Sequence, residues 1–108
     1  MYGTVESINL TEYNKLKELL TMHGIPFEER VRPLFKGLNH YQLIYPKDGP
    51  ERKSDVVIGL GTYGAKDGLL EQMGLIPAEE YIDDDVQGWL DAETVFKRWK
   101  NDYNSSIN

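Results

Sequence analysis

The spacing of hydrophobic residues changes twice along this chain, and that change constrains the fold more than any other feature. Between residues 9 and 24 apolar side chains recur every three or four positions, which is the period of a helix. From residue 25 to residue 60 they mostly alternate or form short runs, as strands do. Beyond Gly61 the helical spacing returns. The succession predicts a fold of the α+β class.

The first helix is predicted over residues 9–24. Asn9 is placed to cap it, Glu12 to complete a capping box, and Ile8 and Tyr13 to form a hydrophobic staple. Gly24 supplies a left-handed stop. The predicted buried stripe consists of Tyr13, Leu16, Leu19, Leu20 and His23.

Three strands are predicted in the middle of the chain, over residues 25–31, 40–45 and 54–60. Val56, Val57 and Ile58 make the last of these the most buried. The segment from Pro46 to Pro50 is typical of a turn, and short connections favour an antiparallel meander.

Two further helices are predicted after the strands. A short one covers residues 67–73 and ends at Gly74, and one more turn is expected over 77–81. Asp91 caps a last helix through about Asp102, whose apolar stripe consists of Ala92, Val95, Phe96, Trp99 and Tyr103. The predicted fold is therefore α+β in a single domain over residues 1–108: an N-terminal helix, a three-stranded antiparallel sheet, a short helix and a C-terminal helix. Residues 103–108 are expected to fray.

Composition excludes several classes of function. The chain has 108 residues and no cysteine, which rules out disulfides, thiolate metal sites and thiol nucleophiles. No apolar run approaches the roughly 20 residues that a membrane span needs, and the N-terminus does not resemble an export signal. We therefore expect a cytoplasmic protein.

Negative charge is concentrated in the second half of the chain. The net charge is −6, and between Asp67 and Glu93 there are nine acidic residues and no Lys or Arg. One interpretation is a solubilising surface with acids at helix N-termini. The other is an acidic patch that docks a basic protein, such as a nucleic-acid-binding host protein, without itself binding nucleic acid or a membrane. The residues predicted to bind this partner are Glu79, Glu80, Asp83, Asp84, Asp85, Trp89 and Asp91.

The same carboxylates do not predict a metal site. Their spacing differs from that of an EF-hand loop, and adjacent carboxylates in an extended segment point in different directions. We expect no metal and no cofactor.

Residues 59–64 match G-x-G-x-x-G between a predicted strand and a predicted helix. A dinucleotide-binding fold needs further parallel strands, and too little chain follows Gly64 to supply them. In addition, Asp67 and Gly68 occupy the position where a pyrophosphate would bind. A tight turn with positive φ is the simpler interpretation. The alternative is a small-ligand or nucleotide site formed by Gly61, Tyr63, Arg30 and Arg32, in which Tyr63 stacks on a base and an arginine pairs with a phosphate.

No residue pattern indicates catalysis. His23 and His40 are not spaced as metal ligands, and no serine lies in a nucleophile elbow. We expect a protein that is not an enzyme.

Three segments carry a resemblance to known proteins: residues 16–29, residues 62–75 around Gly68-Leu69-Leu70-Glu71, and residues 86–96 around Gly88-Trp89-Leu90. They resemble a group of small uncharacterised accessory proteins encoded in phages and prophages of Gram-positive bacteria. The resemblance implies no catalytic residues. It implies an interaction protein that acts on host machinery, including the possibility of an anti-CRISPR-like inhibitor of a host defence system.

Overall fold

The structure is a computed structural model that describes residues 8–33, 39–77, 80 and 85–107. Its elements are α1 (Thr11–Met22), β1 (Glu28–Pro33), β2 (Asn39–Tyr45), β3 (Ser54–Ile58), the 3₁₀ turn η2 (Ala65–Asp67), β4 (Leu70–Met73), β5 (Val86–Leu90) and α2 (Ala92–Ser106). The fold is α+β overall, as expected. The predicted number of strands is wrong, since the structure has five.

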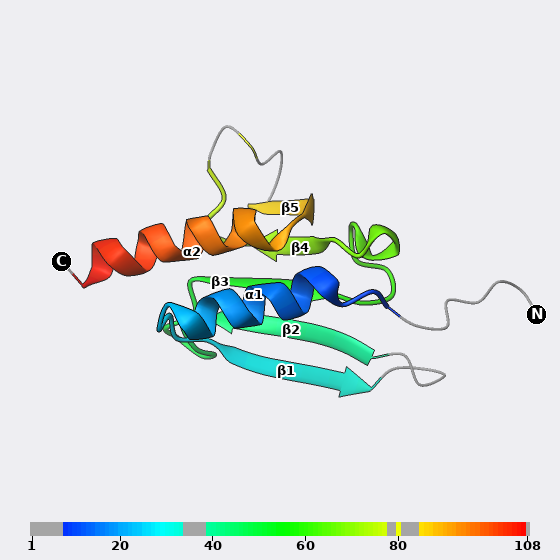
Figure 1. The fold of residues 1–108 in the computed structure, drawn as a ribbon, viewed down its shortest axis with the longest axis horizontal. Coiled ribbons are helices and arrows are strands. Elements are labelled where there is room, and N and C mark those ends of the chain that lie inside the picture. The colour runs from blue at the N-terminus through cyan, green and yellow to red at the C-terminus, as the bar shows by residue number, and fades with distance from the viewer. Residues whose placement is uncertain (1–7, 34–38, 78–79, 81–84, 108) are drawn as a thin grey trace, which may run out of the picture.

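The five strands form one antiparallel sheet in the order β1-β2-β3-β4-β5, so each strand pairs with its neighbours in the sequence. Leu43 lies opposite Val56, which in turn lies opposite Gln72, and this register aligns one row of side chains across three strands. Figure 1 shows α1 and α2 side by side against one face of the sheet. The fold is thus two layers, with the core between them.

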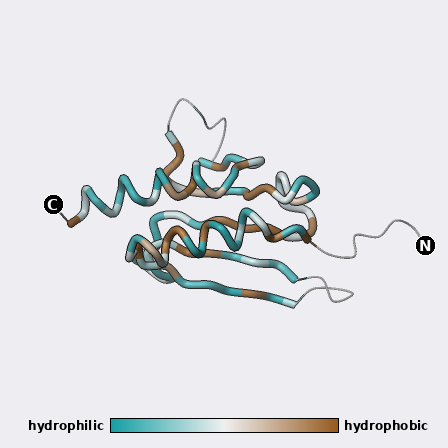
Figure 2. Tube along the Cα trace, in the orientation of Figure 1, coloured by the Kyte–Doolittle hydropathy of each residue, from teal (hydrophilic) through white to brown (hydrophobic). Residues whose placement is uncertain are grey.

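The core is built from the stripes of the two helices and alternate residues of the inner strands. Figure 2 shows hydrophobic residues along both helices and the inner strands, while β1 is mostly hydrophilic. The most deeply buried members of the core are Tyr13, Leu16, Leu20, Leu43, Tyr45, Val56, Ile58, Leu70, Ala92, Val95 and Trp99. Because all of them project into the same layer, the helix stripes and the strand alternation specify a single hydrophobic core.

Helix α1 is two residues shorter at each end than predicted. Asn9 does not occupy the cap position, but its Oδ1 accepts a hydrogen bond from the backbone N of Thr11 at 3.0 Å. Glu12 does not close a capping box; instead its Oε1 accepts a bond from the backbone N of Ala92 at 2.8 Å. His23 was predicted in the buried stripe and is exposed, although its ring packs against Phe96. Gly24 has the predicted left-handed φ of 67°.

The predicted strand over 40–45 is confirmed as β2, and the one over 54–60 is confirmed as the shorter β3. The first strand begins later than predicted, at Glu28, and all six of its residues are exposed. Ile25 is buried ahead of the strand instead of in it. β1 pairs only with β2, and this position at the edge of the sheet explains its exposure.

The helix predicted over residues 67–73 is wrong, because this segment contains the end of η2 and all of β4. Gly68 adopts a left-handed φ of 71°, which ends the 3₁₀ turn before any α-helix can form. Leu70 and Gln72 are both fully buried, which is the alternation of a strand. A buried glutamine disguised this pattern in the sequence.

Strand β5 was not predicted at all. A register shift lies in its pairing with β4, between Leu70 and Gln72, where the ladder passes from Leu90 to Gln87. Two residues of β5, Gly88 and Trp89, therefore lie opposite the single residue Glu71, which is a β-bulge. The bulge destroys the alternation by which a strand is recognised in sequence.

Helix α2 confirms the predicted cap: Oδ1 of Asp91 accepts a hydrogen bond from the backbone N of Thr94 at 2.9 Å. The helix continues to Ser106, past its predicted end. Neither α1 nor α2 combines the length and apolar character that crossing a bilayer requires.

Candidate functional site

The loop between β3 and β4 is held in one conformation by its own polar groups. Gly61 and Gly64 have φ values of 88° and 98°, which confirms the predicted turn with positive φ. The hydroxyl of Thr62 donates to the carbonyl of Gly59 at 2.9 Å and accepts from its N–H at 3.1 Å. Oε1 of Glu71 accepts a bond from the backbone N of Tyr63 at 2.8 Å. The loop therefore presents Tyr63 from a fixed backbone.

The bulge in β5 turns Trp89 towards this loop. Trp89 has a φ of 56°, a left-handed conformation that costs a residue with a side chain about 1–2 kcal/mol. Its N–H donates to the carbonyl of Tyr63 at 3.4 Å. Backbone strain of this kind is concentrated at functional sites, where the surrounding structure compensates for it.

The two aromatic rings stack on each other at the protein surface. Their centroids are 5.5 Å apart with an angle of 15° between the ring planes. Even so, Trp89 remains 58% exposed and Tyr63 56% exposed. Leu60, in the same loop, is also half exposed. We call the stacked rings of Tyr63 and Trp89 the aromatic platform.

Two glycines permit the close approach that forms this platform. A Cβ atom added to Gly88 would lie 2.3 Å from Cβ of Tyr63, and one added to Gly64 would lie 3.0 Å from the backbone of Trp89. Contacts shorter than 3 Å between such atoms are sterically excluded. The loop and the bulge can therefore pack together only with glycine at position 88.

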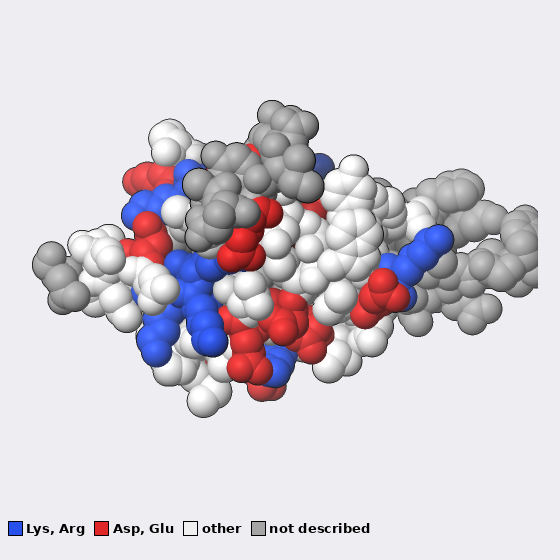
Figure 3. Space-filling view, turned by 90° about the horizontal axis from the view of Figure 1, so that it is seen from above, with Lys and Arg blue, Asp and Glu red and all other residues white. Residues whose placement is uncertain are grey.

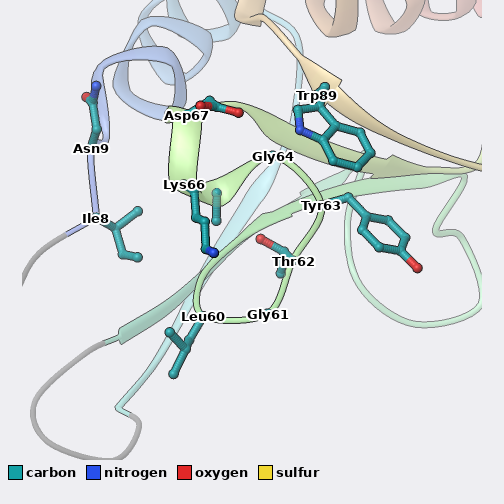
Figure 4. A pocket seen from close by; sticks show the side chains of 11 residues that line it. Ile8, Asn9, Leu60, Gly61, Thr62, Tyr63, Gly64, Lys66, Asp67 and Trp89 are labelled. Carbon is teal, nitrogen blue, oxygen red and sulfur yellow. The ribbon is translucent and has the colours of Figure 1, made fainter. Parts of the chain in front are cut away.

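A pocket of about 520 Å³ lies beside the platform, within the size range of small-molecule sites. It is lined by Ile8, Asn9, Trp89 and the segment of residues 60–67. Figure 4 shows Lys66 extending along the inner side of the loop, whereas the ring of Tyr63 points outward. The pocket thus combines an aromatic wall with one cation and one carboxylate, Asp67. Such a set can hold a flat or apolar group that carries a charge.

The sequence did not predict that Ile8, Asn9, Leu60 and Lys66 line this pocket. One signal for Lys66 was available, because it is the only Lys or Arg between Lys53 and Lys97. Ile8 and Asn9 gave no signal, since they approach the loop only through the tertiary fold, where Asn9 packs against Gly68.

The structure separates the residues predicted to form a nucleotide site. Gly61 and Tyr63 both line the pocket. Arg30 and Arg32 lie on β1, at the opposite edge of the sheet from β5, and neither lines the pocket. Arg30 instead pairs with Asp48 in the turn between β2 and β3. Lys66 is the cation that lines the pocket together with Gly61 and Tyr63.

Several acids of the predicted partner-binding set make internal contacts. Glu80 pairs with Arg98 at 3.2 Å. Asp91 caps α2, and its hydrogen bonds with Thr94 lower the pKa of its carboxyl. Asp85 precedes β5, where its carbonyl accepts a bond from the N–H of Gly74. Glu79, Asp83 and Asp84 lie outside the described residues.

Two other acids from the base-free segment also have internal partners. Glu93 forms an ion pair with Lys15 at 3.0 Å, and Glu71 accepts the hydrogen bond from the backbone N–H of Tyr63. Asp67 and Asp85 make no side-chain hydrogen bond or ion pair within the part of the chain that the structure describes. Within that same part, no group of three His, Asp or Glu side chains is gathered as a metal site.

The chain is similar to part of one larger enzyme. It is 40% identical over 65 residues to a histidine–tRNA ligase of Dehalococcoides mccartyi, a match that covers 60% of this chain and 15% of the ligase. The matched part of the chain therefore spans only a small segment of that protein. No protein-family model matches the chain, and no solved structure matches it.

Proposed function

We propose that this chain is a non-enzymatic interaction protein that docks a basic protein partner through the aromatic platform. The observation that carries the proposal is the exposed Tyr63–Trp89 stack on a strained backbone. A fold selected for stability alone gains little from a tryptophan that stays 58% exposed while its backbone costs free energy. A partner that covers this ring would recover the burial energy, as at interface hot spots, where Trp and Tyr are enriched.

Charge supports a basic partner. The net charge is −6, and Lys66 is the only base between Lys53 and Lys97. Long-range attraction by such a field accelerates the encounter with a positively charged protein. Among the described residues, the side chains of Asp67 and Asp85 are the carboxylates best placed to contribute, because the other described acids of this segment, Glu71, Glu80, Asp91 and Glu93, have internal partners. The resemblance to phage accessory proteins suggests that this partner belongs to a bacterial host, with a defence complex as one candidate.

Capture experiments with matched variants test the proposal. Wild-type protein, Trp89→Ala and Met22→Ala would be immobilised and exposed to extracts of phage-infected or lysogenic Gram-positive cells. Met22 is the control because it is 77% exposed and lies on α1, away from the platform. We expect one basic protein to bind the wild type and Met22→Ala, and to bind Trp89→Ala at least roughly 30-fold more weakly, since hot-spot truncations cost about 2 kcal/mol or more.

Equal capture by Trp89→Ala and Met22→Ala would disprove docking through the platform. Retention that does not change with salt would argue against a basic partner, because exposed charge attraction is screened at high ionic strength. Replacing Asp67 and Asp85 by Asn together is expected to reduce the salt dependence while leaving the contribution of Trp89 in place.

A second candidate function is the binding of a small anionic ligand with an aromatic ring, such as a nucleotide. The pocket favours it, because Gly61, Tyr63 and Lys66 line the same space. A thermal-shift panel of nucleotides and cyclic dinucleotides tests it, since a ligand bound only to the native state raises the melting temperature. The shift should disappear in Lys66→Ala and persist in Arg32→Ala. No shift with any compound would reject this function.

A further inference from the structure

The two outermost strands of the sheet differ in how they are protected against pairing with another chain. Among the residues that the structure describes, β1 and β5 each pair on one side only, so both leave a row of backbone groups without a described partner in the sheet. Natural proteins protect such edges with charged side chains and proline. In β1, four of six residues are charged and the strand ends at Pro33. β5 has the sequence VQGWL, with no charged residue and no proline, so its protection consists only of its short length and the bulge at Gly88 and Trp89.

From this difference we infer that β5 is a strand-pairing edge: an extended segment of a basic partner adds to the sheet beside Val86–Leu90 and packs a side chain against Trp89. Backbone hydrogen bonds supply affinity in this mode of recognition, and side-chain contacts supply specificity. The inference rests on the proposed function, which supplies the basic partner, and it specifies how that partner binds.

The bulge at Gly88 and Trp89 limits how much of β5 can pair regularly. It follows Val86 and Gln87, so a regular ladder with a partner is short. A short ladder binds weakly by itself. The exposed ring of Trp89 lies immediately beyond it and offers the additional buried area that such a complex needs. The bulge therefore removes Gly88 and Trp89 from the regular hydrogen-bond ladder and leaves the ring of Trp89 available for contact with the partner.

Charge selects the occupant of this edge. Asp85 and Asp91 stand immediately before and after β5, and Figure 3, seen from the β5 side, shows uncharged surface lying between charged groups. A second copy of this chain would bring its own Asp85 and Asp91 to the same edge, and like charges would oppose the pairing. A segment with lysine or arginine would instead be attracted by both negative charges. We therefore assign the edge to a basic partner and not to self-association.

The test uses a fluorescent octapeptide of alternating Lys and Val with blocked ends, at low salt. Its control is the same peptide N-methylated at every second residue, which keeps the charge and side chains but removes the donors along one edge. We expect the unmodified peptide to perturb the backbone amide resonances of β5. We expect the methylated peptide to bind at least tenfold more weakly.

Matched protein variants locate the edge. Val86→Lys and Val31→Lys add the same charge to β5 and β1, and only the first should weaken peptide binding, by at least tenfold. The comparison of the two peptides on the wild-type protein still tests the inference if Val86→Lys does not fold.

Equal binding of the two peptides would overturn strand pairing while leaving docking of a basic partner intact. Perturbation of β1 instead of β5, absence of binding by either peptide, or a dimer in sedimentation that Val86→Lys abolishes would each overturn the inference. The capture experiment with Trp89→Ala judges the proposed function separately.

Discussion

Two tyrosine–tryptophan stacks of almost the same geometry occur in this protein, one in the core and one at the surface. Tyr45 and Trp99 stack at 5.2 Å with an interplanar angle of 19°, and Tyr63 and Trp89 stack at 5.5 Å with an angle of 15°. Trp99 is completely buried, whereas Trp89 is more than half exposed. The core stack lies between α2 and β2, and the surface stack joins a loop to a bulge. Ring geometry is therefore the same where the rings stabilise the fold and where they remain available to a partner.

The largest predicted effect separates the two tryptophans. Trp99→Ala should lower the free energy of unfolding by about 3–5 kcal/mol, because it leaves a large cavity in the core. Trp89→Ala should lower it by about 1 kcal/mol or less, since it removes only a partly exposed stack. Urea denaturation of both variants measures the difference. Similar losses for the two would mean that the surface stack is a structural element and not a binding surface.

The next effect separates the two tyrosines. The hydroxyl of Tyr45 donates to Oδ2 of Asp102 at 2.7 Å. Tyr45→Phe should therefore cost about 1 kcal/mol. The hydroxyl of Tyr63 has no hydrogen-bond partner among the described residues, so Tyr63→Phe should change stability very little. If Tyr63→Phe lowers the free energy of unfolding as much as Tyr45→Phe does in the same denaturation assay, the two tyrosine hydroxyls do not differ in this way.

A smaller effect tests the backbone strain at the surface stack. Trp89→Gly should be more stable than Trp89→Ala by roughly 0.5–1 kcal/mol, because glycine adopts the φ of 56° without steric cost and alanine does not. The same exchange at Trp99, within α2, should have the opposite sign, since glycine weakens a helix interior. If alanine is favoured at position 89 as well, Trp89 is not strained.

The smallest predicted effect is a pH dependence at the core stack. Partial burial raises the pKa of the Asp102 carboxyl, but hydrogen bonds from Tyr45 and Lys53 and the charge of Lys53 outweigh it, so the pKa falls below its ordinary value of 3.8. A depressed folded-state pKa stabilises the protein above the unfolded-state pKa. That stability is lost as pH falls through the folded-state value.

Denaturation of the wild type and of Asp102→Asn between pH 6 and pH 2 measures this contribution. The stability advantage of the wild type should be constant above about pH 5 and should shrink on acidification. Tyr45→Phe should reduce the size of that change. An advantage that grows as pH falls would show that the carboxylate of Asp102 destabilises the fold.

The two helices and the strands β2 and β3 were predictable because their signals are local. The apolar stripe of Tyr13, Leu16 and Leu20 has one period, and the cap at Asp91 is a single side chain bonding to its own helix. β4 and β5 were not predictable in this way. Gln72 can be fully buried because Arg98 and other residues satisfy the hydrogen-bonding groups of its side-chain amide. Nη1 of Arg98 donates a hydrogen bond to Oε1 of Gln72 at 2.8 Å, and Arg98 lies 26 residues away in the sequence. A polar residue at a core position hides the alternation of a strand.

The candidate site was predictable only in part. Gly61, Tyr63 and Trp89 could be singled out because glycine-rich turns and unexplained aromatics are visible in sequence. Their proximity to one another could not, since it depends on the bulge and on the contact between Gly88 and Tyr63. Arg30 and Arg32 were grouped with them wrongly, because sequence gives no information on which edge of the sheet a strand occupies. Lys66 replaces them in the pocket.

The sequence by itself determined the α+β class, the existence of the two helices with most of their apolar stripes, the cap at Asp91, and the concentration of negative charge between Asp67 and Glu93. These features depend on residues that are close together in the sequence, so the sequence alone reveals them. The tertiary structure alone decided that the sheet has five strands, that Trp99 is covered while Trp89 is not, and that β5 forms an uncharged edge. Each of these depends on contacts between residues far apart in the chain, which only the folded packing brings together.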